Sequence, residues 1–136
     1  MDWKLLLYSF IIVFFVGFIG SLFTNTGSGW YDGVRPSITP PNFVFPIVWN
    51  LLFLMIVFSM YFVWKKRKDL VKFYIINLLF NGLWTVFYFG LKNVLLAFID
   101  LILIWGSIIY LIFIVWKVDK RASVLLIPYL LWVSFA

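Results

Sequence analysis

The chain has 136 residues, of which 65% are hydrophobic, 24% aromatic and only 12% charged. A mean hydropathy of +1.10 does not fit a soluble domain. Cysteine, histidine and glutamate are absent, which excludes disulfides, thiolate or imidazole metal sites, histidine triads and paired-glutamate hydrolysis. We therefore expect no metal site and no cofactor. The net charge of +6 lies at the ends of apolar segments, which favours membrane orientation over nucleic acid binding.

Five apolar segments follow one another along the chain, at about residues 4–23, 43–64, 70–89, 94–116 and 122–136. The first is roughly 20 residues long, which matches the ~30 Å hydrocarbon core at 1.5 Å rise per residue. The fifth has only 15 positions, whereas a span needs about 17–25, so we expect this helix to be incomplete. The sequence predicts an all-α membrane protein, a single-domain bundle of five transmembrane helices over 1–136.

Between the first two segments, residues 30–49 (WYDGVRPSITPPNFVFPIVW) contain four of the five prolines. Proline fixes φ, removes a backbone donor and makes the preceding residue extended, so this stretch cannot be one continuous helix. We expect a stiff loop that ends at Pro41 and leads into a helix on which Phe45 and Trp49 share a face. Such a loop could act as a lid over a flat ligand. A plain connector anchored by interfacial aromatic residues is the alternative.

Basic residues gather on one side of the predicted bundle. The residues on this side are Lys4, Lys65, Lys66, Arg67, Lys68, Lys72, Lys117, Lys120 and Arg121. The other side has only Arg35 and Lys92. The positive-inside rule therefore predicts a cytoplasmic N-terminus and places the proline-rich loop on the opposite face.

The third segment carries a stripe of polar and aromatic residues. Asn77, Asn81, Trp84 and Tyr88 are spaced 4, 3 and 4 apart, so they share one helix face. An asparagine amide in hydrocarbon is costly unless it is hydrogen-bonded, so this face should point into the bundle. The stripe is either a pocket wall or a set of hydrogen bonds that only joins helices.

Two further features lie inside predicted spans. Asp100 is the only acidic residue deep in a span, and an intramembrane carboxylate indicates a functional site, with a structural hydrogen bond as the alternative. In the fifth segment Pro128 should kink the helix. Trp132 and Ala136 follow on the same face. Four tryptophans lie within spans and are pocket candidates: Trp49, Trp84, Trp105 and Trp132.

Taken together, these residues resemble the tryptophan-rich sensory protein/translocator protein family (TspO/MBR). The matches, in family order, are Trp30-Tyr31, Arg35-Pro36, Pro40-Pro41, Pro46 to Trp49, Asn81 to Trp84, Tyr88-Phe89-Gly90, Ala97 to Asp100 and Pro128 to Ala136. The resemblance implies five transmembrane helices, often as a homodimer, around a pocket closed by the first loop. It also implies binding of tetrapyrroles such as protoporphyrin IX and of isoquinoline-carboxamide or benzodiazepine-type drugs.

The resemblance also assigns roles to residues. Trp49 and Trp132 would be the tryptophans tied to the light-dependent porphyrin degradation reported for bacterial members. With the residues argued above, the candidate ligand-binding set is Tyr31, Phe45, Trp49, Asn81, Trp84, Asp100, Trp132 and Ala136. The small residues linked to dimer packing in the family are missing from 70–81, which leaves a homodimer through that face open.

Three functions compete on this reading. The first is a membrane receptor or carrier for porphyrin-like ligands, in which a flat macrocycle stacks on indole rings. The second is a light-dependent porphyrin-degrading enzyme that uses Trp49 and Trp132. The third is a cation exporter that uses Asp100, which the odd number of spans and the lack of an internal repeat count against.

Overall fold

The computed structural model describes residues 2–21 and 44–135, and within them every regular element is helical. The α-helices are α1 (Trp3–Ser21), α3 (Val44–Lys66), α4 (Val71–Thr85), α5 (Val94–Trp116) and α6 (Lys120–Phe135). A short 3₁₀ turn, η1 (Lys68–Leu70), precedes α4, and a π-helical turn, η2 (Val86–Gly90), follows it. The proline-rich loop that was predicted to be a lid lies outside the described residues, as do Tyr31 and Ala136.

Four helical segments of this part of the chain are long and apolar enough to cross a membrane: residues 3–20, 47–66, 68–88 and 94–116. Their mean hydropathies run from 1.5 to 2.5. Helix α6 has 16 residues, which is shorter than a full span of about 17–25 residues. The predicted helical membrane bundle is therefore confirmed as an architecture, with four long apolar helices and one shorter helix in the described residues.

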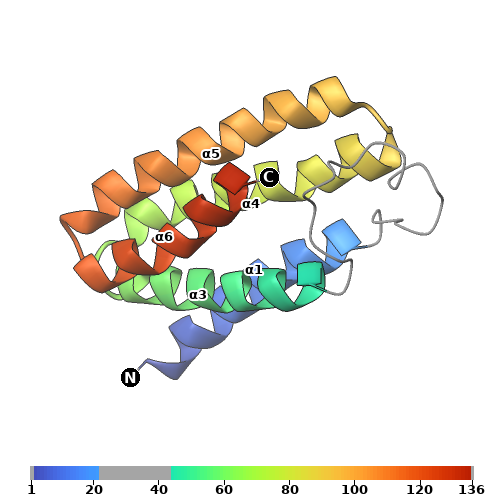
Figure 1. Ribbon diagram of the computed structural model, residues 1–136. Helices are drawn as coiled ribbons and strands as arrows, with labels where there is room; N and C mark the ends of the chain where they lie inside the picture. Colours follow the sequence, from blue (N-terminus) through green and yellow to red (C-terminus); the bar gives the residue numbers. More distant parts are fainter. Residues whose placement is uncertain (1, 22–43, 136) are drawn as a thin grey trace.

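The helices form a ring in which each packs against two main neighbours, in the order α1, α3, α6, α5, α4 and back to α1 (Figure 1). Inward-facing side chains of these helices make one hydrophobic core. Large apolar side chains such as Phe15, Phe18 and Phe113 are more than 60% exposed on the outside. Such a surface suits a lipid environment, since monomeric soluble proteins rarely expose large apolar patches.

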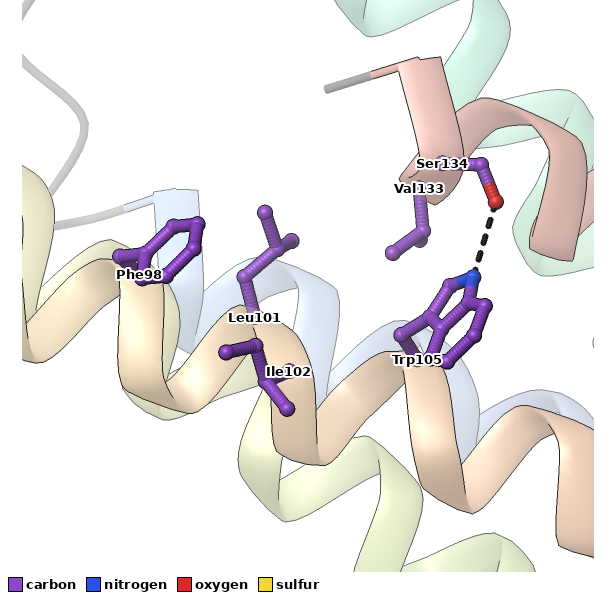
Figure 2. Close-up of a pocket in the computed structure, with 6 residues that line it drawn as sticks. All are labelled: Phe98, Leu101, Ile102, Trp105, Val133 and Ser134. Atoms are coloured by element: carbon purple, nitrogen blue, oxygen red, sulfur yellow. Dashed lines mark hydrogen bonds between the residues drawn. The ribbon is translucent and has the colours of Figure 1, made fainter.

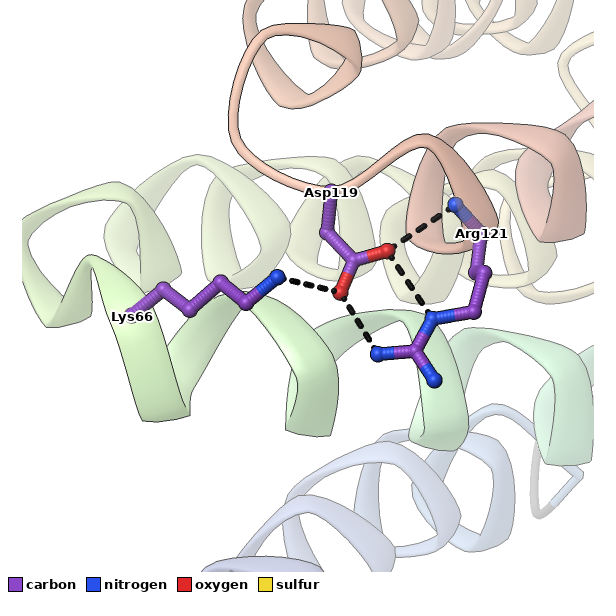
Figure 3. Close-up of polar contacts among 3 residues, drawn as sticks. All are labelled: Lys66, Asp119 and Arg121. Atoms are coloured by element: carbon purple, nitrogen blue, oxygen red, sulfur yellow. Dashed lines mark hydrogen bonds and ion pairs between the residues drawn. The ribbon is translucent and has the colours of Figure 1, made fainter.

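One end of the ring is held by an ion-pair cluster around Asp119, in the turn between α5 and α6 (Figure 3). Its carboxylate accepts hydrogen bonds from Lys66 Nζ at 3.0 Å and from the backbone N–H of Arg121 at 2.9 Å. Arg121 Nη2 donates a further bond at 3.0 Å. These bonds hold the pKa of Asp119 well below its usual range, and the bond from the Arg121 side chain has the largest effect. Burial of the carboxylate opposes the shift. The cluster joins the end of α3 to the start of α6.

Candidate ligand site

A chain of hydrogen bonds joins α4, α5 and α6 inside the ring. Asn81 Nδ2 donates to Tyr129 Oη at 2.9 Å, and Tyr129 Oη donates to Asn77 Oδ1 at 3.0 Å. Asn77 Nδ2 then donates to Ser107 Oγ at 2.7 Å. Ser107 Oγ donates in turn to the carbonyl oxygen of Ile104 at 2.8 Å.

The direction of this chain follows from its last member. The carbonyl of Ile104 can only accept, so the hydroxyl of Ser107 is used as a donor and must accept from Asn77. Asn77 then offers its oxygen to Tyr129, whose single proton is used there, so Asn81 must donate through its nitrogen. As a result, Asn81 keeps its carbonyl oxygen Oδ1 as the group with which it can accept a further donor.

The helix-joining hydrogen bonds that the sequence left as an alternative for the asparagine stripe are therefore present. Asn77 and Tyr129 are 2% and 0% exposed, which makes the chain part of the core, whereas Asn81 at its end is only half-buried. Tyr129 connects both asparagines, and it is absent from the predicted site residues. Its only sequence signal was its place next to Pro128 in a family motif.

Two of the predicted site tryptophans meet beside this chain. The ring centroids of Trp49 on α3 and Trp132 on α6 are 6.5 Å apart at an interplanar angle of 88°, an edge-to-face arrangement. Trp49 also lies edge-to-face on Tyr129, with centroids 6.2 Å apart, and tilted on Phe53 at 5.7 Å. Both indoles are half-buried, so the core does not fully enclose either of them.

Trp84 stacks on Tyr88 with ring centroids 4.7 Å apart and an interplanar angle of 10°. These residues straddle the change from α4 to η2, where the backbone N–H of Leu91 donates to the carbonyl of Val86 at 2.8 Å. A π-helical turn changes the side-chain spacing, and such turns are frequent at functional sites. The sequence predicts a continuous α-helix over this stretch, because no residue type in it signals the extra residue that a π-helical hydrogen bond encloses.

Asp100 lies six residues after the start of α5, on the buried face that also carries Ala97, Ile104 and Ile108. The residue is 3% exposed, and its Oδ2 has no hydrogen-bond partner among the described residues. Polar atoms buried in this way are rare in native proteins and call for an explanation.

Trp105, the remaining pocket candidate among the tryptophans, lies apart from the cluster of Trp49 and Trp132. It is 44% exposed and lines a shallow groove of about 380 Å³ between α5 and α6. Figure 2 shows its indole N–H donating to Ser134 Oγ, at 2.9 Å. Its neighbours in the groove, Phe98 and Ile102, are also exposed. Its helical position, five residues after Asp100, turns it to the outside of the ring.

The predicted set thus divides into three groups. Trp49 and Asn81 contact Tyr129, and Trp132 joins this group through its contact with Trp49. Trp84 and Asp100 stand on α4 and α5 at the same end of the ring, the end that holds the last residues of α4 and α6 and the first residues of α3 and α5 (Figure 1). For Tyr31, Ala136 and the side chain of Phe45, the structure describes no position.

Comparison with known proteins identifies the family of this chain. The TspO/MBR family matches residues 9–136. The chain is 40% identical to the tryptophan-rich protein TspO of Chlorobaculum tepidum over 89% of this chain and 82% of that protein. It is 37% identical to the protein of the same name from Archaeoglobus fulgidus, over 96% and 89% respectively. It is also 33% identical to the translocator protein of Homo sapiens, over 87% and 75%. With most of its length matched and several apolar helices, the chain is a membrane protein that belongs to the TspO/MBR family.

Proposed function

We propose that the protein is an integral membrane receptor or carrier that binds porphyrin-type tetrapyrroles, such as protoporphyrin IX, in the interior of the helix ring. Flat drugs of the isoquinoline-carboxamide and benzodiazepine type would use the same site. The observation that carries the proposal is the meeting of Trp49 and Trp132 at 6.5 Å, from helices far apart in the sequence. Two indoles at right angles offer one ring face and one ring edge to a flat ligand.

The polar chain beside the indoles supports the same assignment. Small-molecule sites are mostly apolar and aromatic, with a few polar groups that fix the ligand's orientation. Here Asn81 ends the chain with an acceptor atom, and it is held in place by Tyr129. A half-buried amide that is fixed in this way can address one edge of a macrocycle while the rings bind its face.

The test is a titration of purified protein with protoporphyrin IX in the dark, followed by porphyrin absorbance and tryptophan fluorescence. Trp49→Phe and Trp132→Phe should each weaken binding by about tenfold or less, since an aromatic contact contributes about 0.5–1.5 kcal/mol and ~1.4 kcal/mol is a factor of ten. Trp116→Phe is the matched control, because Trp116 is exposed at the far end of α5. Wild-type protein that does not bind protoporphyrin IX would end the proposal.

The alternative function is light-dependent degradation of the bound porphyrin. The edge-to-face pair favours it because a redox-active Trp49 would have a second indole, Trp132, within 6.5 Å to receive a reactive intermediate. Under illumination, loss of porphyrin absorbance should then fall far more in Trp49→Phe than dark affinity does. Equal effects on binding and on bleaching would mean that the indoles only hold the ligand.

The orientation in the bilayer is part of the proposal. Lys66, Arg67 and Arg121 lie at the Asp119 end of the ring, and Lys92 lies in the turn at the opposite end of α4. By the positive-inside rule the Asp119 end and the N-terminus are cytoplasmic. The sequence has no cysteine, so Lys68→Cys and Lys92→Cys give single labelling sites without further changes. An impermeant thiol reagent applied to intact cells should label only Lys92→Cys.

A second copy of the chain is the other proposed partner, and cross-linking in membranes would test for the homodimer. The region 70–81 contains no small residues, so a dimer would have to pack through larger side chains of α4 or through another helix.

A further inference from the structure

The starting observation is that Asp100 stands alone among the aspartates that the structure describes. Asp2 caps α1 by accepting from the backbone N–H groups of Lys4 and Leu5. Asp69 accepts two hydrogen bonds from Arg67. Asp119 is paired with Lys66 and Arg121. Asp100 is as buried as Asp119, yet its Oδ2 has no partner in the described part of the chain.

Asp100 also lies level with Asn81 along the bundle. Asn77 Nδ2 lies 3.4 Å from the carbonyl oxygen of Ile104, which fixes the register of the antiparallel helices α4 and α5. Asn81 is one turn beyond Asn77, and Asp100 is one turn before Ile104, so both lie about 6 Å from this contact in the same direction. Asn81 faces inward, since it bonds to Tyr129 of α6. Asp100 is on the buried face of α5.

At this level the interior therefore offers acceptor atoms. The direction of the hydrogen-bond chain leaves Asn81 with its carbonyl oxygen, and a carboxylate has only acceptor atoms. The aromatic rings of Trp49, Tyr129 and Trp132 lie at the same end of the ring. Aromatic ring faces attract organic cations, and a carboxylate at the same end of the ring adds a negative charge.

We infer that the interior also binds flat aromatic cations, with Asp100 as their counter-ion and Asn81 Oδ1 as a second acceptor. This inference rests on the proposed ligand site, because it uses the same residues around Asn81 and the aromatic rings. It differs in the ligand's chemistry: the ligand brings a positive nitrogen, whereas none of the ion pairs among the described residues includes Asp100. Isolated charges in the membrane interior are costly unless they are paired, so the ligand's cation would supply the missing partner.

The test compares two probes with the same three fused rings in an uncharged detergent at neutral pH. Proflavine is cationic under these conditions, whereas acridine is largely uncharged. Wild-type protein should bind proflavine more tightly than acridine. Asp100→Asn keeps the shape of the side chain and should weaken proflavine binding about tenfold to a hundredfold, the range for a hydrogen bond to a charged group, while acridine binding changes little.

Asp69→Asn is the matched control, because it removes the same formal charge from an exposed site at the other end of α4 and should change neither affinity. Equal affinity of wild-type protein for both probes, or unchanged proflavine binding in a folded Asp100→Asn variant, overturns the inference. The wild-type comparison stands even if that variant fails to fold. Protoporphyrin IX is titrated in parallel: binding of protoporphyrin without proflavine refutes this inference alone, and the reverse refutes the proposed function alone.

Discussion

Replacing Tyr129 by phenylalanine removes one oxygen atom from the middle of the bundle and leaves the ring that packs on Trp49. The lost hydroxyl accepts from Asn81 and donates to Asn77. Polar contacts between membrane helices are worth ~0.6 kcal/mol on average, so the two bonds contribute about 1 kcal/mol. Asn77 Oδ1 then loses its hydrogen-bond donor, although Asn77 is only 2% exposed to solvent. An unsatisfied buried acceptor of this kind costs about 1–3 kcal/mol. We expect a total loss of about 2–4 kcal/mol in the free energy of unfolding.

The measurement is reversible unfolding in mixed detergent micelles, followed by tryptophan fluorescence. Tyr110→Phe is the matched control, because Tyr110 is 51% exposed on α5, where its ring lies edge-to-face on Phe73. That variant should unfold within about 0.5 kcal/mol of wild type. If Tyr129→Phe costs no more than Tyr110→Phe, the hydrogen-bond chain does not hold the helices together. The orientation of the Asn81 amide, which was derived from this chain, would then have no support.

Two other variants test the two ends of the ring. Asn81→Ala should weaken ligand binding in a titration more than it lowers stability. The reason is that Asn81 ends the hydrogen-bond chain, so its loss leaves Tyr129 bonded to Asn77. A collapse of stability with normal affinity would assign Asn81 a structural role. Asp119→Asn should lower the free energy of unfolding by about 1 kcal/mol or more. Since the pKa of Asp119 is depressed in the folded state, its contribution is complete above the unfolded pKa of about 4 and is lost as the pH falls below it. Melting curves should therefore converge for wild type and Asp119→Asn at low pH.

The features that the sequence predicts well are those set by composition along one helix. Apolar runs bounded by charged or turn-forming residues placed α5 at 94–116, where the structure also has it. The 3.6-residue period of a helix puts Asn77 and Asn81 on one face, and the cost of an amide without hydrogen bonds in hydrocarbon predicts that this face points inward. The hydrogen bonds of both asparagines to neighbouring helices agree with this prediction.

The features that it misses depend on which helices are neighbours. Tyr129 joins the two asparagines only because α6 lies across the ring from α4, and no local pattern encodes that. Trp105 sits at a depth that suits a pocket, but the ring order turns it outward to Ser134. The π-helical turn after Thr85 is also a local exception that residue types do not announce.

Two glycines give a final test of the packing between α1 and α3. An ideal Cβ on Gly17 would lie 2.7 Å from Phe53 Cε2, whereas a Cβ on Gly106 would meet no atom within 4 Å. Both positions are helical, so Gly106→Ala should stabilise the protein by about 0.5–1 kcal/mol through helix propensity alone.

Gly17→Ala gains the same propensity but must move Phe53, which is 8% exposed and wedged between the rings of Phe14 and Trp49. Overpacking of this kind costs about 1–3 kcal/mol, so the net change should be destabilising. Because Phe53 touches Trp49, the variant should also weaken protoporphyrin IX binding, whereas Gly106→Ala should leave it unchanged. Stabilisation by both substitutions would show that α1 can shift away from α3 at little cost, and the contact would then play no part in positioning Trp49.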